Sequence, residues 1–242
     1  MSEFVLFTDF GRRDPYQAQM AAVLQRSVPD WRVVDLHAEV PAFALELGAY
    51  LLPSYVPEFP AGSIFVCVVD PGVGGPRDAV VLRADDRWFV GPDNGLLRVV
   101  EARAAKARYW YLETPGAASA SFHGRDVFAP AAARLARGWR PEGGGHKGRA
   151  LPEGWPEELD RVVYADHYGN LMIGRRAETL RPDARIRAGE LILSQARTFS
   201  DHADGMPFWY VNANGLVELA VYQDSAAHRL GLGPGDPVQV LE

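Results

Sequence analysis

The sequence predicts an α/β protein in two parts: an amino-terminal domain, residues 1–145, with a mainly parallel sheet, and a small all-β domain, residues 158–242. Three observations support this. Strand-like and helical segments alternate through the first half, residues 138–155 are rich in Gly and Pro, and the segments beyond are short and separated by turn residues. Alternating strands and helices are typical of a parallel sheet covered by helices, and short strands with frequent turns indicate an all-β unit.

The elements of the first domain follow from its apolar periodicity. Apolar runs predict strands, apolar positions at helical spacing predict helices, and the turn residues Asp85-Asp86 predict a hairpin. Asp9, Asp35 and Asp70 fall at the ends of strands, where ligands gather beside parallel sheets. In chain order we expect strand 4–7, helix 16–27, strand 32–36, helix 43–52, strand 63–69, hairpin strands 79–83 and 88–90, a short helix after 91–95, and a helix over 126–137.

The composition of the chain changes at residue 138. Frequent Gly and Pro give residues 138–155 little capacity to pack, so this segment is expected to be a linker. From residue 161 onward the segments alternate and turn often, with hairpin turns expected at 168–170 and 212–215.

Composition narrows the class of protein. With 242 residues, 48% of them hydrophobic, the chain can bury a substantial core without disulfides, and its single Cys67 lies in an apolar run that predicts burial. A net charge of -6 with scattered basic residues argues against a nucleic-acid partner. No apolar run approaches the length of a membrane span, and the amino terminus lacks the basic region of a signal peptide, so we expect a cytoplasmic protein without a membrane partner.

Several familiar motifs are excluded because the sequence around them does not fit. Asp9-Phe10-Gly11 matches the metal-binding tripeptide of kinases, but no glycine-rich loop precedes it. Gly72-Val73-Gly74 resembles a dinucleotide fingerprint, yet Arg77 occupies the third glycine position and a strand follows. The histidines lack zinc-ligand spacing and there is no Gly-x-Ser-x-Gly elbow, so we expect neither a metal site nor a serine hydrolase.

Asp70, Arg77 and His123 form the strongest candidate site. They place a carboxylate, a guanidinium and an imidazole among Gly-rich loops at predicted strand ends, which favours acid-base chemistry at a carbon or acyl centre. The alternative is that the aspartates form turns, the arginines are surface charges and His123 is a loop residue. Gly72, two residues after Asp70, and Gly124, directly after His123, favour a site, because glycines let backbone and ligand approach closely.

Six sequence blocks carry a resemblance that covers the chain from residue 8 almost to its end. The blocks are Thr8-Asp9-Phe10-Gly11, Val69-Asp70-Pro71-Gly72-Val73-Gly74, Gly91-Pro92-Asp93-Asn94-Gly95-Leu96, the run from Phe122 to Pro130, the run from Asp166 to Leu171, and Asn214-Gly215-Leu216-Val217-Glu218. With these blocks in this order and approximate spacing, the chain resembles the S-adenosyl-L-methionine (SAM) hydroxide adenosyltransferases. Those enzymes are the water-using relatives of the fluorinases and chlorinases.

The resemblance implies a fold, an activity and a set of residues. The fold is an α/β domain joined to a small β-barrel, in a homotrimer whose sites lie between subunits. The activity is hydrolysis of SAM to adenosine and L-methionine, with SAM as substrate and no cofactor. Catalytic roles fall on Asp70, Arg77 and His123, a ribose-binding role on Asp14, and further substrate-binding roles on Asp9, Phe43, Asp166, Tyr168, Asn170, Phe199 and Asn214.

Differences within the family separate the possible activities. The halide-using relatives have tyrosine at the position of Asp70, lack His123, and in the fluorinases carry a serine at Gly124, so these positions point to water. Ala213 stands where many members have a serine near the methionine carboxylate, and residues 173 and 174 depart from a common Thr-Asn. Two alternatives stay open: a protein that binds adenosine or SAM without turnover, and a SAM-dependent halogenase.

Overall fold

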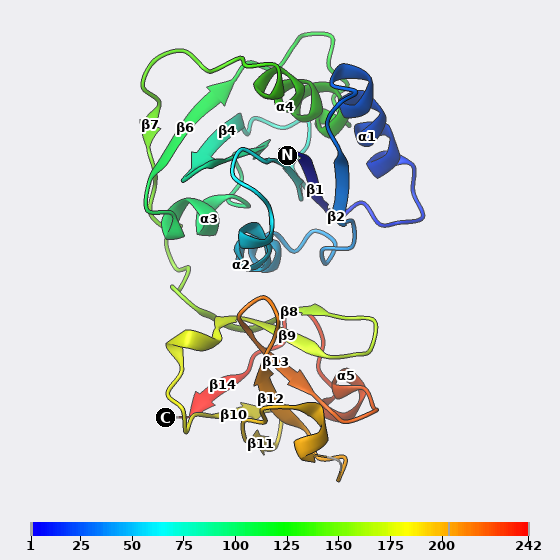
Figure 1. The fold of residues 1–242 in the computed structure, drawn as a ribbon, viewed down its shortest axis with the longest axis vertical. Helices are drawn as coiled ribbons and strands as arrows, with labels where there is room; N and C mark the ends of the chain where they lie inside the picture. The colour runs from blue at the N-terminus through cyan, green and yellow to red at the C-terminus, as the bar shows by residue number, and fades with distance from the viewer. Residues whose placement is uncertain (1, 203, 242) are drawn as a thin grey trace. The chain divides into compact units, whose positions relative to one another are not determined.

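A computed structural model describes residues 2–202 and 204–241 of the chain (Figure 1). The chain divides into two compact units, Met1–Glu153 and Gly154–Glu242, and each is described by itself. Unit 1 is an α/β unit built on one large sheet. Unit 2 is built from antiparallel strands.

The sheet of unit 1 has seven strands in the order β2-β1-β3-β5-β4-β6-β7. The first four of these strands pair in parallel, while β4, β6 and β7 pair antiparallel. The sheet is therefore mixed, because the short turn at Asp85-Asp86 returns the chain antiparallel between β4 and β5. The strands are β1 (Phe4–Thr8), β2 (Val33–His37), β3 (Ile64–Val68), β4 (Ala79–Ala84), β5 (Arg87–Pro92), β6 (Ala107–Leu112) and β7 (His146–Lys147).

Helices cover both faces of this sheet (Figure 1). Alternate residues of the central strands, such as Phe4 and Leu6, pack with Met20 and Leu24 of α1 and with the alanines of α4. On the other face Phe7 contacts Tyr55 of α2. The helices are α1 (Tyr16–Ser27), α2 (Leu45–Tyr55), the 3₁₀ turn η1 (Val56–Glu58), α3 (Arg98–Arg103), the π-helical turn η2 (Gly124–Phe128) and α4 (Ala129–Ala136).

Every residue of the central strands β1 and β3 is buried. Cys67 of β3 is 0% exposed and not bonded in a disulfide, as its apolar surroundings predict. Burial raises the pKa of its thiol, so the sulfur stays protonated and behaves as a small apolar group.

The segment expected to be a linker is partly built into unit 1. His146 and Lys147 form β7 against β6, and Arg149 bonds to Asp93 and Glu101. Through the buried carboxylate of Glu101 and the half-buried one of Asp93, Arg149 binds this Gly-rich stretch to the unit, which its composition does not predict.

Unit 2 contains a four-stranded sheet, β12-β13-β9-β8, and a three-stranded sheet, β11-β10-β14. Its core gathers Leu171, Ile173, Trp209 and Leu219. Turns at 166–170 and 212–215 join β8 to β9 and β12 to β13, as expected, and a short helix is an addition to the all-β prediction. The elements are β8 (Leu159–Ala165), β9 (Leu171–Arg176), η3 (Ala177–Thr179), β10 (Arg185–Ala188), β11 (Leu191–Leu193), η4 (Phe199–His202), β12 (Phe208–Val211), β13 (Leu216–Ala220), α5 (Ala226–Leu230) and β14 (Gln239–Leu241).

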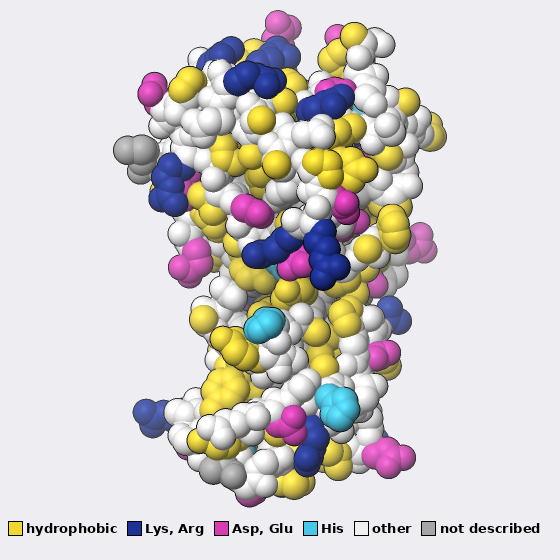
Figure 2. All heavy atoms as spheres, turned by 90° about the vertical axis from the view of Figure 1, so that its right-hand side faces the viewer, with side chains coloured by type: hydrophobic (Ala, Val, Ile, Leu, Met, Phe, Trp, Pro, Cys, Tyr) yellow, Lys and Arg dark blue, Asp and Glu magenta, His cyan; other side chains and the backbone are white. Residues whose placement is uncertain are grey.

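The strands described in unit 2 stay in two separate sheets, so the expected closed barrel is not confirmed. Among the described residues no helix combines the length and apolar character needed to cross a bilayer. On the face shown in Figure 2, Lys and Arg side chains are interspersed with Asp and Glu side chains rather than gathered into one basic patch.

Candidate active site

Two carboxylates lie side by side where the central parallel strands end. Asp9 follows β1 and Asp70 lies two residues beyond β3, and these strands pair with Thr8 opposite Val68. Burial raises the pKa of Asp9, and the charge of Asp70 raises it further, although a hydrogen bond from the Phe43 N–H opposes both. Asp35, also expected at a strand end, instead lies within β2 and accepts a hydrogen bond from Gln17 Nε2 at 2.9 Å.

The predicted catalytic residues are in direct contact. Arg77 Nε donates to Asp70 Oδ1 at 3.0 Å, and Arg77 Nη2 donates to Asp70 Oδ2. Arg77 Nη2 also lies 2.8 Å from His123 Nδ1. The side chains of Asp70 and Arg77 are only 4% and 11% exposed, so water screens this ion pair poorly.

The contact with Arg77 fixes the proton on His123. A guanidinium has donors only, so Nδ1 of the ring must accept, and in a neutral imidazole the other nitrogen, Nε2, then carries the hydrogen. Burial lowers the pKa of His123, and the positive charge of Arg77 lowers it further. His123 is therefore a neutral ring that offers an N–H, and protonation would break its bond to Arg77.

Two loops far apart in sequence meet to form this arrangement. A Cβ on Gly74 would lie 2.4 Å from the carbonyl oxygen of Ala120, and the residue has a φ of +78°, so only glycine allows this approach. His123 then stands at the start of the π-helical turn η2, where its ring meets Phe128 edge-on. The guanidinium of Arg77 lies over the same Phe128 ring, 5.5 Å from its centroid.

A pocket of about 240 Å³ opens beside these residues. Four of the predicted site residues line it, Asp9, Phe43, Asp70 and His123, and aromatic and apolar side chains supply most of the rest. Arg77 is not among the lining residues and so reaches the pocket through Asp70 and His123. The other lining residues are Phe10, Tyr16, Ala42, Val68, Val73, Ser121, Phe122 and Gly124.

Phe43 has an unusual backbone. Its φ is +62°, in the left-handed region that non-glycine residues rarely adopt, and its side chain is exposed, with the residue 74% accessible. The N–H of Phe43 donates to Asp9 Oδ2 at 3.1 Å. The carboxylate thus holds the loop in a strained conformation that presents the ring at the pocket, and strain of this kind is concentrated at functional sites.

Asp14, expected to bind the ribose, lies in the exposed loop before α1 and does not line the pocket. Its role stays a prediction. Among the carboxylates of this unit, the pocket contains Asp9 and Asp70 instead.

The remaining predicted residues belong to unit 2. Asp166 and Asn170 hold their turn closed: Asp166 Oδ1 accepts from the Tyr168 and Asn170 N–H groups, and Asp166 Oδ2 accepts from Asn170 Nδ2 at 2.9 Å. Tyr168, at the tip of this turn, is 75% exposed. Asn214 is half-buried, in the turn between β12 and β13.

Phe199 extends an aromatic group on unit 2 that sequence reasoning missed. Its ring contacts Phe208 and Tyr210, and the Tyr210 hydroxyl donates to Glu218. Burial raises the pKa of Glu218, and Asn212 Nδ2 donates to it at 2.8 Å. Alternation in β12 and β13 places Tyr210 and Glu218 directly opposite each other, but sequence alone does not reveal that pairing.

In unit 1 sequence reasoning missed Phe10, Tyr16 and Phe122. The three rings meet edge-on or tilted with centroids 5.4 to 5.8 Å apart and form one wall of the pocket. Phe10 and Phe122 each adjoin a predicted site residue, which was the available signal. Within residues 2–202 and 204–241, no His, Cys, Asp and Glu side chains gather in threes to hold a metal ion.

Comparison with known families decides where the chain belongs. Residues 4–145 match the SAM hydroxide adenosyltransferase N-terminal domain, and residues 160–239 match the C-terminal domain of the same family. The chain is a SAM hydroxide adenosyltransferase family member.

Relatives of this SAM hydroxide adenosyltransferase family member are similar over the whole chain. It is 38% identical over 264 residues to an (R)-S-adenosyl-L-methionine hydrolase of Thermus thermophilus, with 100% of both proteins covered. A fluorinase of Actinopolyspora mzabensis is more distant, at 26% identity over 289 residues, with 96% of this chain and 95% of the fluorinase covered. The crystal structure of a conserved protein from Thermotoga maritima superposes with a TM-score of 0.84 at 29% identity and covers 99% of this chain and 100% of that one.

Proposed function

We propose that this family member hydrolyses SAM to adenosine and L-methionine by attack of water on C5′ of the substrate. The observation that carries the proposal is the contact of Asp70, Arg77 and His123 at the edge of an aromatic pocket. The C5′–sulfonium bond breaks with its electrons going to sulfur, a bond forms between C5′ and the water oxygen, and one proton leaves the water. Sulfur becomes neutral, so it needs no general acid.

The chemical difficulty is to align the water and to remove its proton. His123 offers Nε2–H, a donor suited to holding a water lone pair, and its Nδ1 is occupied by Arg77. Asp70 is therefore the better proton acceptor of the two, since each of its oxygens retains a lone pair beyond the bond to Arg77. Positioning and general-base catalysis of this kind contribute about 10²–10⁴-fold for the base alone.

The aromatic wall favours the reaction in a second way. The substrate carries its positive charge at sulfur and loses that charge in the transition state, so a poorly solvated site assists the step. The rings of Phe10, Tyr16 and Phe122 and the exposed ring of Phe43 supply apolar surface around the two carboxylates. These surfaces also suit the nucleoside of SAM.

The decisive experiment determines which product receives the oxygen atom of water. The purified protein is incubated with SAM in ¹⁸O-water, and the products are identified by mass. We expect the label in the 5′-hydroxyl of adenosine, unchanged by a chelator, since we propose that neither a metal nor a cofactor takes part. Unlabelled adenosine, or activity that is lost to a chelator and restored by a divalent ion, would contradict the proposal.

The substrate epimer is part of the same experiment. The Thermus thermophilus relative is named for the (R) epimer at sulfur, and we propose the same preference here. The two sulfonium epimers are assayed separately, and the ratio of kcat/KM between them gives the preference.

The two alternatives are separated by the same assay. A protein that only binds adenosine or SAM would show saturable binding without products. A halogenase would form a 5′-halo-adenosine when chloride or fluoride is present. A Cβ added at Gly124 would lie 2.8 Å from Met20 Sδ, so the serine of the fluorinases would fit here only if Met20 shifted, which disfavours halide use.

We also propose that ribose hydroxyls are bound by a carboxylate of unit 1. Asp14 is the candidate from resemblance, and Asp9 is the candidate that lines the pocket. Separate Asp9→Asn and Asp14→Asn variants distinguish them, because loss of the ribose ligand weakens adenosine binding most. Asp9→Asn keeps an acceptor for the Phe43 N–H, so the loop is retained.

We further propose a cytoplasmic homotrimer in which unit 2 of a neighbouring copy completes each site. Resemblance supports this, and complementation tests it: Arg77→Ala and Asn170→Ala chains, each nearly inactive, are unfolded and reassembled together. Regained activity supports a shared site. Confirmed co-assembly without any regain would contradict it.

A further inference from the structure

Asp70 and Arg77 must keep a fixed separation, yet the strands beside them are not neighbours in the sheet. Asp70 follows β3, Arg77 precedes β4, and β5 lies between these two strands. The residues that follow β5 therefore lie between the two and can contact the backbone beside each of them.

Asn94, just beyond β5, reaches the strand that carries Asp70. Its Nδ2 donates to the carbonyl oxygen of Val69 at 2.8 Å, and its Oδ1 accepts from the Leu96 N–H at 3.2 Å. The second bond decides which end of the amide faces Val69. Val69 is 0% exposed, so its carbonyl oxygen takes this bond from Asn94 rather than from bulk water.

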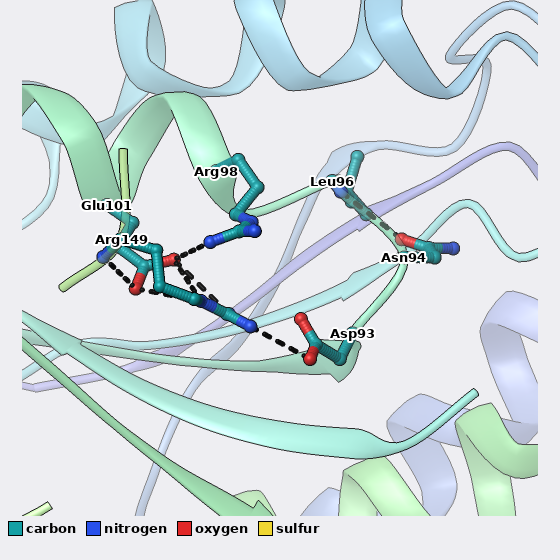
Figure 3. Close-up of polar contacts among 6 residues, drawn as sticks. All are labelled: Asp93, Asn94, Leu96, Arg98, Glu101 and Arg149. Atoms are coloured by element: carbon teal, nitrogen blue, oxygen red, sulfur yellow. Dashed lines mark hydrogen bonds and ion pairs between the residues drawn. The ribbon is translucent and has the colours of Figure 1, made fainter. Parts of the chain in front are cut away.

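The residue before Asn94 reaches the other strand. The N–H of Asp93 donates to the carbonyl oxygen of Asp78 at 2.9 Å, and Asp78 directly follows Arg77. Two consecutive residues of one loop thus hold the backbone next to both members of the Asp70–Arg77 pair. The side chains of Asp93 and Asn94 diverge, one toward Arg149 and the other toward Leu96 (Figure 3).

Arg149 supports the loop from its outer side. Its Nη1 donates to Asp93 Oδ2 at 2.9 Å, and its backbone N–H donates to Glu101 Oε1 at 2.8 Å (Figure 3). The guanidinium also lies over the Tyr109 ring, 3.9 Å from its centroid. None of these contacts involves Val69, so Arg149 provides a matched control for stability.

We infer that Asn94 is a positioning residue, whose side-chain amide sets the Asp70 carboxylate against Arg77 through the carbonyl of Val69. The kcat measurements below rest on the proposed hydrolysis, whereas the NMR measurement does not.

The test compares Asn94→Ala, Asn94→Asp and Arg149→Lys with the wild type. Both Asn94 variants lose the donor to Val69, and we expect kcat to fall by up to about 10²-fold while adenosine affinity is unchanged, because the pocket residues remain. Asn94→Asp retains the acceptor for Leu96. Its new carboxyl regains a donor when protonated, so its kcat relative to wild type should rise as the pH falls, whereas that of Asn94→Ala should not.

Arg149→Lys should lower the Tm but leave kcat close to the wild-type value. If Arg149→Lys and Asn94→Ala lower kcat equally at a similar loss of Tm, both variants act by destabilising the unit as a whole, and Asn94 is not a positioning residue. Wild-type kcat in both Asn94 variants would also overturn the inference.

A second readout does not depend on turnover. The NMR signal of the His123 imidazole, assigned with a His123→Gln variant, reports its contact with Arg77 in the resting protein. We expect its titration to shift in Asn94→Ala and to stay in place in Arg149→Lys. An inactive wild type refutes the proposed function alone, and an unshifted His123 signal in Asn94→Ala refutes the positioning role.

Discussion

Arg77→Ala should damage stability and catalysis by separable amounts. The Asp70 side chain is 4% exposed and accepts two bonds from Arg77, so the variant leaves a buried carboxylate without its cation. Removing one partner of a buried ion pair costs about 3–5 kcal/mol, and we expect the lower end because Asp70 borders an open pocket. Because His123 also loses its partner, kcat should fall by about 10²–10³-fold.

A second substitution separates the two effects. Adding Asp70→Asn removes the unpaired charge, so the double variant should recover most of the lost stability but none of the lost activity. Urea unfolding gives the free energies, and product formation far below the unfolding midpoint gives kcat. Recovery of activity together with stability would refute the reasoning, because the loss in Arg77→Ala would then reflect unfolding rather than chemistry.

Three further outcomes follow from the same geometry. The acid limb of kcat/KM should include a titration of His123 below pH 6.5, the ordinary pKa of histidine, because burial and Arg77 lower the pKa of this residue. His123→Gln should remove that titration and leave the part of the limb that belongs to the carboxylates, and a His123 titration above pH 6.5 would contradict the neutral ring. Gly124→Ser should lower the free energy of unfolding in urea by about 1–3 kcal/mol, since its Cβ would lie 2.8 Å from Met20 Sδ and 3.2 Å from Phe122. The variant should also form no 5′-halo-adenosine at high chloride or fluoride. Detection of that product would contradict the steric reasoning. Burial lowers the pKa of His37 from 6.5 to about 4. The folded protein therefore loses about 3 kcal/mol of stability as the pH falls from 6.5 toward 4, because the unfolded chain takes up the proton more readily. His37→Gln should remove this loss from the pH profile of the free energy of unfolding.

The sequence predicts features that depend on local pattern. Helix 16–27 has the expected bounds because its apolar spacing is regular, and Asp9 and Asp70 lie together because adjacent parallel strands end at one edge. Features that depend on pairing between distant segments escape prediction. The place of β5 between β3 and β4 is one, and the attachment of Arg149 to Glu101 is another.

The site shows the same division between local and distant effects. The residue types Asp70, Arg77 and His123 are visible in the sequence, but the proton on His123 follows only from which nitrogen meets Arg77. The sequence also does not reveal that Asp14 is exposed, because a carboxylate in a turn has the same sequence pattern whether it faces a ligand or solvent.

Cys67 gives the molecule a built-in chemical reporter. It is the sole thiol of the chain, is wholly buried, and lies three residues before Asp70 on a strand flanked by β1 and β5. A thiol reagent can modify it only when the core around β3 opens. Where this core closes again faster than the reagent reacts, the rate of labelling measures the free energy of that opening, without any introduced probe.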